Sequence, residues 1–144
     1  MPTLRYFDYA EVQDVNGQVH SVGSRVAPIE ETVDGYVDHK TVALATAASL
    51  TVFISSGALS NFDFFWLKST QALKIELTVD RGGEVGLEEL VHVQPANKPF
   101  RLPTDDALAN YLGTLSGGTA DVIDEIVVRN ESGSTAYIEY LVAT

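Results

Sequence analysis

The sequence contains no cysteine, which excludes a disulfide framework, thiolate metal ligands and a cysteine nucleophile. Basic residues are also scarce, because nine Lys and Arg stand against 20 Asp and Glu and give a formal net charge of -11. Such a chain repels phosphate, so we expect neither nucleic acid nor an anionic membrane as a partner. The acidic balance is typical of a soluble surface, and it also suits an acidic face for a basic partner.

Long apolar runs are missing as well. No segment approaches the roughly 20 apolar residues of a membrane span, and residues 1–13 lack the charged region and apolar core of a signal peptide. The longest candidate, residues 41–59, is interrupted by Thr and Ser, and it predicts two strands around a turn. With 144 residues, the chain can bury a core without disulfides.

Short runs of Val, Ile, Leu, Phe and Thr alternate along the chain with clusters of Gly, Asn, Asp and Ser. This punctuation predicts an all-β protein, an antiparallel two-sheet β-sandwich that is jelly-roll-like. We expect the sandwich domain over residues 39–144 and an irregular N-terminal arm and hairpin over residues 1–38. One or two helical turns are expected within residues 104–115, where Thr104 can act as the N-cap.

Three turn signals predict hairpins. Asn16 and Gly17 suit a type I′ turn, and two further turns are expected at residues 80–83 and 130–134. Other strands are expected at residues 40–46, 50–55 and 62–67, with an edge strand at the proline-flanked residues 99–103.

Two neighbouring strands differ in their patterns. In "LKIELTVD", Leu73, Ile75 and Leu77 share one face, which predicts one buried and one wet side. In "FDFFWL", Phe64 and Trp66 share one face while the other is also apolar, so both faces need cover from this chain or another subunit. We predict these five side chains to be core. The aromatic cluster can instead form an interface or a platform for sugars.

No enzyme motif is present, and we predict a non-enzymatic protein without cofactor or metal. His20, His39 and His92 fall in different predicted elements, which disfavours a metal triad. Ser116 lacks a nucleophile elbow, because Thr114 stands where glycine is required. Several carboxylates can share calcium only if the fold gathers them, and they have no EF-hand spacing. These are Asp105, Asp106, Asp121, Asp124 and Glu125.

The segment "PTLRYFDYAEV" carries the candidate interface residues. Leu4, Tyr6, Phe7 and Tyr9 offer apolar and aromatic anchors on a stretch too irregular to build its own core. We expect residues 1 to 10 to form an intermolecular arm. The alternative is that they pack on their own sandwich as an edge strand.

Two stretches, "FFWLKSTQALKIELTVD" and "ADVIDEIVVRNESGSTAYIEYLVAT", carry a family resemblance over about the last 85 residues. Together they resemble small β-sandwich accessory virion proteins of tailed bacteriophages. In that family a strand, a Ser-x-Gln turn and an alternating strand precede a terminal hairpin. The matching positions are Ser69, Gln71, Ile123, Ile126, Val128, Asn130, Ser132, Gly133, Ala136 and Ile138.

The resemblance implies a structural virion protein that binds and stabilises an assembled capsid, that is, a decoration (cement) protein, or a tail component. Its partner would be the major capsid protein, and self-association, with a trimer favoured, would be expected. Such a protein is made in the host cytoplasm and located on the capsid surface. The alternative is a carbohydrate- or receptor-binding β-sandwich module of a phage tail.

Overall fold

A computed structural model describes residues 3–6, 9–13, 15–23, 26, 29–32, 37–57, 62, 64–80, 87–102 and 122–143. The chain divides into two compact units, Met1–Gly35 and Tyr36–Thr144. The helical turn predicted at residues 104–115 lies outside the described residues, as does Ser116.

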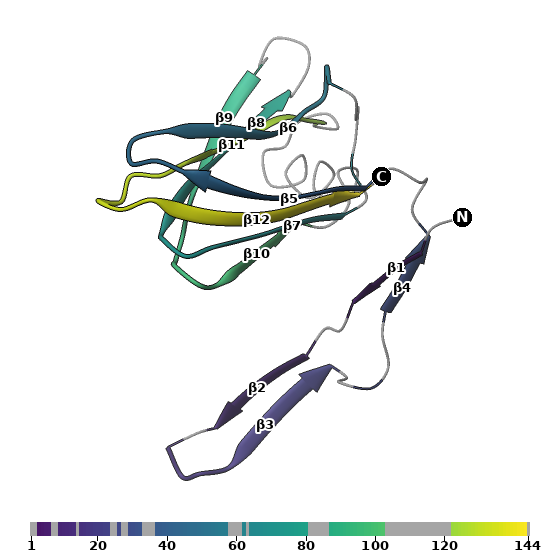
Figure 1. Ribbon diagram of the computed structural model, residues 1–144. Coiled ribbons are helices and arrows are strands. Elements are labelled where there is room, and N and C mark those ends of the chain that lie inside the picture. The colour runs from purple at the N-terminus through teal and green to yellow at the C-terminus, as the bar shows by residue number, and fades with distance from the viewer. Residues whose placement is uncertain are drawn as a thin grey trace. The chain divides into compact units, whose positions relative to one another are not determined.

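The second unit is an antiparallel two-sheet β-sandwich, as predicted (Figure 1). Its described strands are β5 (Val37–Leu44), β6 (Ser49–Ile54), β7 (Phe64–Ser69), β8 (Leu73–Asp80), β9 (Leu87–Gln94), β10 (Pro99–Leu102), β11 (Val122–Arg129) and β12 (Ala136–Ala143). One sheet, the β7 sheet, has the order β10-β7-β12-β5, and the other, the β8 sheet, has the order β6-β11-β8-β9. Most successive strands alternate between the sheets, and this order is that of an eight-stranded jelly roll.

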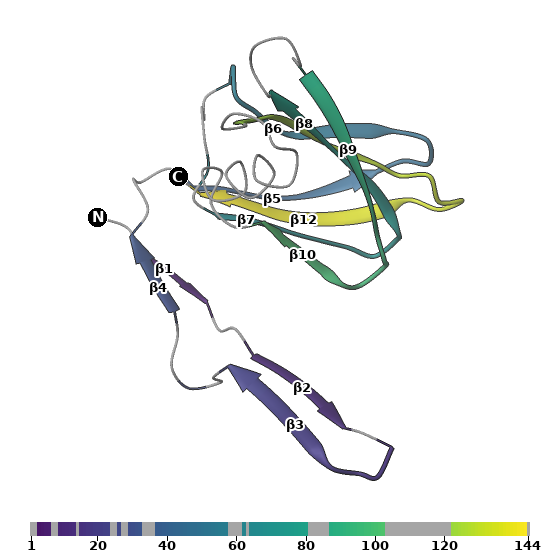
Figure 2. The ribbon, with the colours of Figure 1, turned by 180° about the vertical axis from the view of Figure 1, so that it is seen from behind.

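The sheets face each other in both views of the molecule (Figure 2), and the core lies between them. The alternation of β8 has the predicted effect, because Leu73, Ile75 and Leu77 are buried. Strand β7 contributes Phe65 and Leu67, both 0% exposed, to the same core. Aromatic side chains and branched aliphatic side chains from the two inner faces therefore exclude water together.

The prediction that Phe64 and Trp66 belong to the core needs correction, because both lie on the outward side of β7. Trp66 is only partly buried, and Phe64 is buried but lies outside the main core cluster. The Arg101 guanidinium lies 5.3 Å from the centre of the Phe64 ring and helps to cover it. Alternation assigns residues to two opposite faces of a strand, but when both faces are apolar it does not say which one turns inward.

Two of the predicted hairpins are confirmed. Strand β2 (Tyr9–Gln13) pairs with β3 (Val19–Gly23), and β8 pairs with β9, whose connecting turn lies outside the described residues. The β2–β3 turn is not the predicted type I′, because Gly17 has a positive φ of 80° whereas Asn16 is not among the positive-φ residues. The Gln13 side-chain amide donates to the Gly17 carbonyl oxygen at 3.3 Å and closes a wider loop.

The third predicted hairpin, around residues 130–134, is wrong. Strand β11 pairs with β6 and β8, whereas β12 pairs with β5 and β7, so this turn carries the chain from one sheet to the other. The backbone of Asn130 explains the crossover, because it exchanges hydrogen bonds with Ala47 and Ala48 in the β5–β6 turn at 2.8 and 3.0 Å. Two turns that are distant in the sequence are thus joined at one end of the sandwich.

The remaining strand predictions are confirmed. Strands β5 and β6 surround a turn at which Ala47 has a φ of 61°, and they lie in opposite sheets. The short β10 begins at Pro99 and forms an edge of the β7 sheet, where the missing proline N–H costs no ladder hydrogen bond.

The N-terminal unit contains the predicted hairpin and a second strand pair. Strand β1 (Thr3–Tyr6) pairs antiparallel with β4 (Ile29–Thr32), and β2 pairs with β3 between them in the chain. The two pairs are therefore nested and form two-stranded sheets of their own. A two-stranded sheet is marginally stable by itself in water, because it has no third strand or core to bury its side chains.

Candidate functional site

Four of the described side chains of the N-terminal unit are exposed valines. The exposed fractions are 101% for Val15, 54% for Val19, 70% for Val22 and 89% for Val26. Single exposed valines are ordinary on a protein surface, but here two lie on β3 and two lie in the turn before it and the bend after it. Contact with another surface would remove the apolar area of these valines from water.

The predicted interface residues fall on this unit. Leu4 and Tyr6 lie in β1, opposite Glu31 and Ile29, and Tyr9 begins β2. Phe7 lies outside the described residues.

The candidate metal ligands are not brought together. His20, His39 and His92 lie in β3, β5 and β9. Within the described ranges, no three His, Asp or Glu side chains are placed to hold a metal ion.

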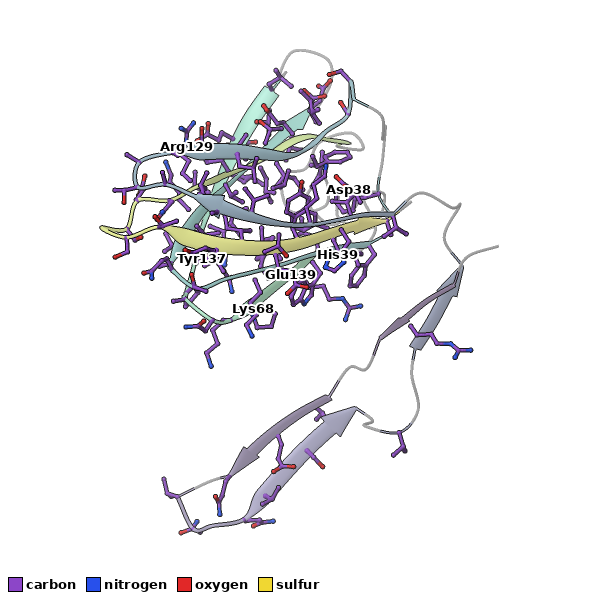
Figure 3. All side chains as sticks on the ribbon, viewed as in Figure 1. Asp38, His39, Lys68, Arg129, Tyr137 and Glu139 are labelled. Carbon is purple, nitrogen blue, oxygen red and sulfur yellow. The ribbon has the colours of Figure 1, made fainter. Side chains whose placement is uncertain are left out.

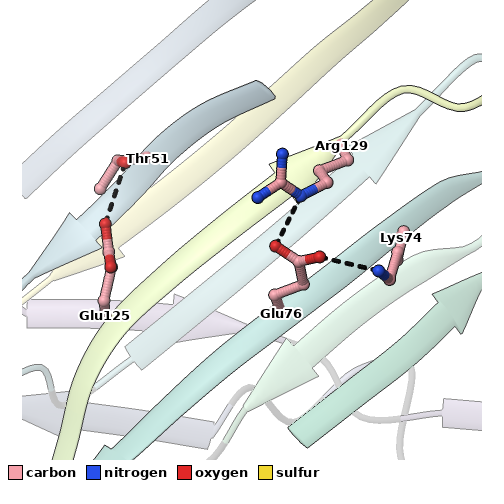
Figure 4. Close-up of polar contacts among 5 residues, drawn as sticks. All are labelled: Thr51, Lys74, Glu76, Glu125 and Arg129. Atoms are coloured by element: carbon pink, nitrogen blue, oxygen red, sulfur yellow. Dashed lines mark hydrogen bonds and ion pairs between the residues drawn. The ribbon is translucent and has the colours of Figure 1, made fainter. Parts of the chain in front are cut away.

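The carboxylates of β11 bind neighbouring hydroxyl groups instead. Ser55 donates to Asp124, and the Thr51 hydroxyl donates to Glu125 at 3.2 Å (Figure 4). Asp105, Asp106 and Asp121 lie outside the described residues.

A charge cluster lies on the outer face of the β8 sheet. The Glu76 carboxylate, 9% exposed, contacts the Lys74 ammonium at 2.8 Å and the Arg129 guanidinium at 2.7 Å (Figure 4). The hydrogen bond from Lys74, supported by that from Arg129, lowers the pKa of Glu76, and the pKa of Lys74 is raised in return. Each carboxylate oxygen of Glu76 is held in an ion pair, so the cluster links β8 to β11. This arrangement is that of a structural ion-pair cluster and does not indicate a general acid or base.

A shallow cavity of about 280 Å³ opens on the outer face of the β7 sheet, and we call it the β7-sheet pocket. Its lining comes from strands β5, β7 and β12, the β7–β8 turn and the β9–β10 turn: Thr41, Lys68, Ser69, Thr70, Asn97, Tyr137 and Glu139. Strand register brings them together, because Glu139 on β12 stands opposite Thr41 on β5 and Lys68 on β7. Figure 3 shows Lys68, Tyr137, Glu139 and His39 along β12 and its neighbours.

The pocket walls are held by the backbone. The Asn97 N–H donates to the Ser69 carbonyl at 2.7 Å, and the Gln94 side chain donates to the Lys98 carbonyl at 2.9 Å. His39 Nε2 lies 2.9 Å from Glu139 Oε1 and orients that carboxylate. The pocket thus joins an exposed aromatic ring with fixed hydrogen-bonding groups.

Sequence reasoning did not find this pocket, although part of its signal was present. Alternation in "AYIEYLVA" places Tyr137 and Glu139 on the side opposite the core residues Ile138 and Tyr140. The hairpin prediction paired this strand with β11, so it did not place the strand beside Lys68 on β7. Only the correct sheet assignment puts the pocket residues side by side.

No family model, curated protein or solved structure matches the chain. Its own structure defines it as an all-β jelly-roll sandwich with a separate N-terminal unit of paired strands. None of the described residues forms a helix with the length and apolar character that a membrane crossing requires.

Proposed function

We propose that the protein is a non-enzymatic structural virion protein that binds and stabilises an assembled phage capsid. The observation that carries this proposal is the N-terminal unit, whose described valines are exposed and whose strands form two-stranded sheets, which are marginally stable by themselves. Binding to another surface offsets this instability, because it buries the apolar side chains and can add strands to the open edges. The family resemblance of the last 85 or so residues supports the same role.

The capsid is the surface that the N-terminal unit contacts in this proposal, with the major capsid protein as the partner. Leu4, Tyr6, Phe7 and Tyr9 serve as its anchors, since aromatic rings bury a large area for little loss of side-chain entropy. The protein is made in the host cytoplasm and remains on the virion surface.

Self-association as a trimer belongs to the same proposal. A symmetric oligomer presents several N-terminal units at once, so each contact after the first forms at a high effective concentration. Multi-angle light scattering tests this point: a trimer mass is expected, and a monomer at high micromolar concentration would contradict it.

Capsid binding is tested with a pair of matched variants. Val22→Asp alters the N-terminal unit at a side chain 70% exposed, and Val93→Asp makes the same change on β9 at a side chain 69% exposed. Each protein is mixed with capsids that lack it, and both co-sedimentation and the capsid melting temperature are measured. We expect Val22→Asp to weaken binding about tenfold or more and Val93→Asp to bind as the wild type does. The opposite ranking would refute the assignment to the N-terminal unit.

A carbohydrate-binding module is the second candidate, and the β7-sheet pocket is the observation that favours it. An exposed ring beside mixed hydrogen-bonding groups suits a sugar. A glycan array separates this candidate from the first, because capsid binding through the N-terminal unit requires no glycan.

A further inference from the structure

We propose that the β7-sheet pocket binds one neutral sugar ring of a glycan, with Tyr137 stacked on the sugar and Lys68, Glu139 and Asn97 bound to its hydroxyl groups. This inference deepens the second candidate function by naming its site and its ligand class. It uses no residue of the N-terminal unit, so it stands or falls independently of capsid binding.

The aromatic ring is both exposed and held in place. Tyr137 is 58% exposed, although it lies within a strand that has neighbours on both sides. Its N–H donates to the Thr70 hydroxyl at 3.0 Å, and its carbonyl accepts from the Thr70 N–H at 3.1 Å. The ring thus projects from a rigid backbone, and the apolar C–H face of a sugar can cover it and remove apolar surface from water.

The polar lining matches hydroxyl groups better than it matches an ion. A sugar hydroxyl both donates and accepts hydrogen bonds, while Lys68 only donates, Glu139 only accepts and the Asn97 amide does both. Among the described residues Lys68 enters no ion pair, so its ammonium can serve a ligand. An anion would meet the Glu139 carboxylate and a cation would meet Lys68, which leaves a neutral ligand as the best match.

The size and position of the pocket limit the ligand to one ring at a time. Its volume of about 280 Å³ falls near the lower end of small-molecule sites, which span about 300–1,000 Å³. It is open to solvent, so the rest of a glycan can extend away from it. Trp66 precedes Lys68 by two residues on the same outward side of β7 and is partly exposed, which adds aromatic surface beside the pocket.

The pocket is largely formed before a ligand arrives. Asn97 adopts a positive φ of 60° and is fixed by its N–H bond to Ser69, and the bond from His39 restrains the Glu139 carboxylate. Little conformational entropy of these groups is then lost on binding, which favours affinity.

The test begins with a glycan array on the full chain and continues with NMR titration of the ¹⁵N-labelled protein by methyl glycosides of neutral hexoses and N-acetylhexosamines. We expect saturable shifts at the amides of Thr70, Asn97 and Tyr137, with a Kd of about 1 mM, the range of a single weak site. Tyr137→Ala should raise this Kd about tenfold or more. Tyr137→Phe should stay near the wild-type value because it keeps the ring.

Val91→Ala is the control, since it truncates an exposed strand residue on the β8 sheet, and its Kd should be unchanged. If Tyr137→Ala proves misfolded by circular dichroism, Lys68→Ala takes its place at an exposed position and should also weaken binding. The proposal is overturned if no neutral glycoside shifts these amides, if folded Tyr137→Ala binds as well as the wild type, or if only sulfated or sialylated glycans bind. Capsid co-sedimentation of Tyr137→Ala is measured in parallel, and wild-type behaviour there separates the two functions.

Discussion

Replacing Asn130 with alanine should destabilise the sandwich more than any other single polar change at that turn. Asn130 is 0% exposed, and its side-chain amide donates to the carbonyl oxygens of Leu44 at 2.9 Å and Ser134 at 2.8 Å. Its side-chain oxygen accepts from the N–H and the hydroxyl of Ser132 at 3.1 and 2.6 Å. One side chain thus connects the β11–β12 crossover to the end of β5.

The magnitude follows from the burial of each hydrogen bond. The Leu44 carbonyl lies in a buried environment, and losing its donor costs about 1–3 kcal/mol. The other three bonds are partly buried, so water can replace them in part, and each contributes about 0.5 kcal/mol. We therefore expect Asn130→Ala to lower the free energy of unfolding by about 3 kcal/mol and the Tm by about 10 °C.

Urea denaturation followed by the fluorescence of the single tryptophan, Trp66, and by circular dichroism measures this change. Ser132→Ala is the matched control, because it leaves the Leu44 bond intact, and it should cost less than about 1 kcal/mol. A loss below about 1 kcal/mol for Asn130→Ala would refute the reasoning, since it would mean that the crossover does not depend on this side chain.

Three further predictions use the same denaturation assay or light scattering. Phe65→Ala should lower the free energy of unfolding by about 3–5 kcal/mol, because the ring is fully buried in the core. Phe64 lies on the outer face, so Phe64→Ala should lower it clearly less. Equal losses would contradict the inward orientation of Phe65. Lys74 and Arg129 hold the pKa of Glu76 below its usual value of 4.5. The ion pairs of Glu76 therefore stabilise the fold fully above about pH 4.5, and this stabilisation is lost progressively as the pH falls through the lowered pKa. Glu76→Gln should therefore be less stable than the wild type at pH 7, with a difference that shrinks below about pH 4.5, and a constant difference would argue against the ion pairs. The proposed trimer should keep its mass on dilution into the low micromolar range, and dissociation at high micromolar concentration would count against it.

The strands themselves were predictable because their signals are local. The alternation of Leu73, Ile75 and Leu77 depends only on the two-residue period of an extended chain, and the structure buries these three side chains. Proline at the start of β10 likewise marks an edge strand through its missing N–H. Turn residues between apolar runs indicated where the chain reverses or crosses.

The pairing of the last two strands was not predictable in the same way. The residues from Asn130 to Ser134 suit a turn, but a turn can return the chain to the same sheet or carry it to the facing one. The outcome depends on partners far away in sequence, since Asn130 binds Leu44 and the β5–β6 turn. Ile126, Val128 and Ile138 fill the core on either side of this crossover.

The two candidate sites also differ in how far the sequence could predict them. The aromatic and apolar anchors within residues 1 to 10 could be named from the sequence, whereas the β7-sheet pocket needed β5, β7, β12 and the β9–β10 turn to be placed together.

The sequence by itself determined the all-β class, the approximate strand positions and the two sides of each strand, because these follow from backbone geometry and from the residues of one segment. The tertiary structure decided which sheet each strand joined and which side of β7 turned inward, so that Phe65 became core and Trp66 faced outward beside Lys68. The physical reason is that burial is a property of the assembled sheets. The free energy gained by covering an apolar face depends on what the rest of the chain places against it.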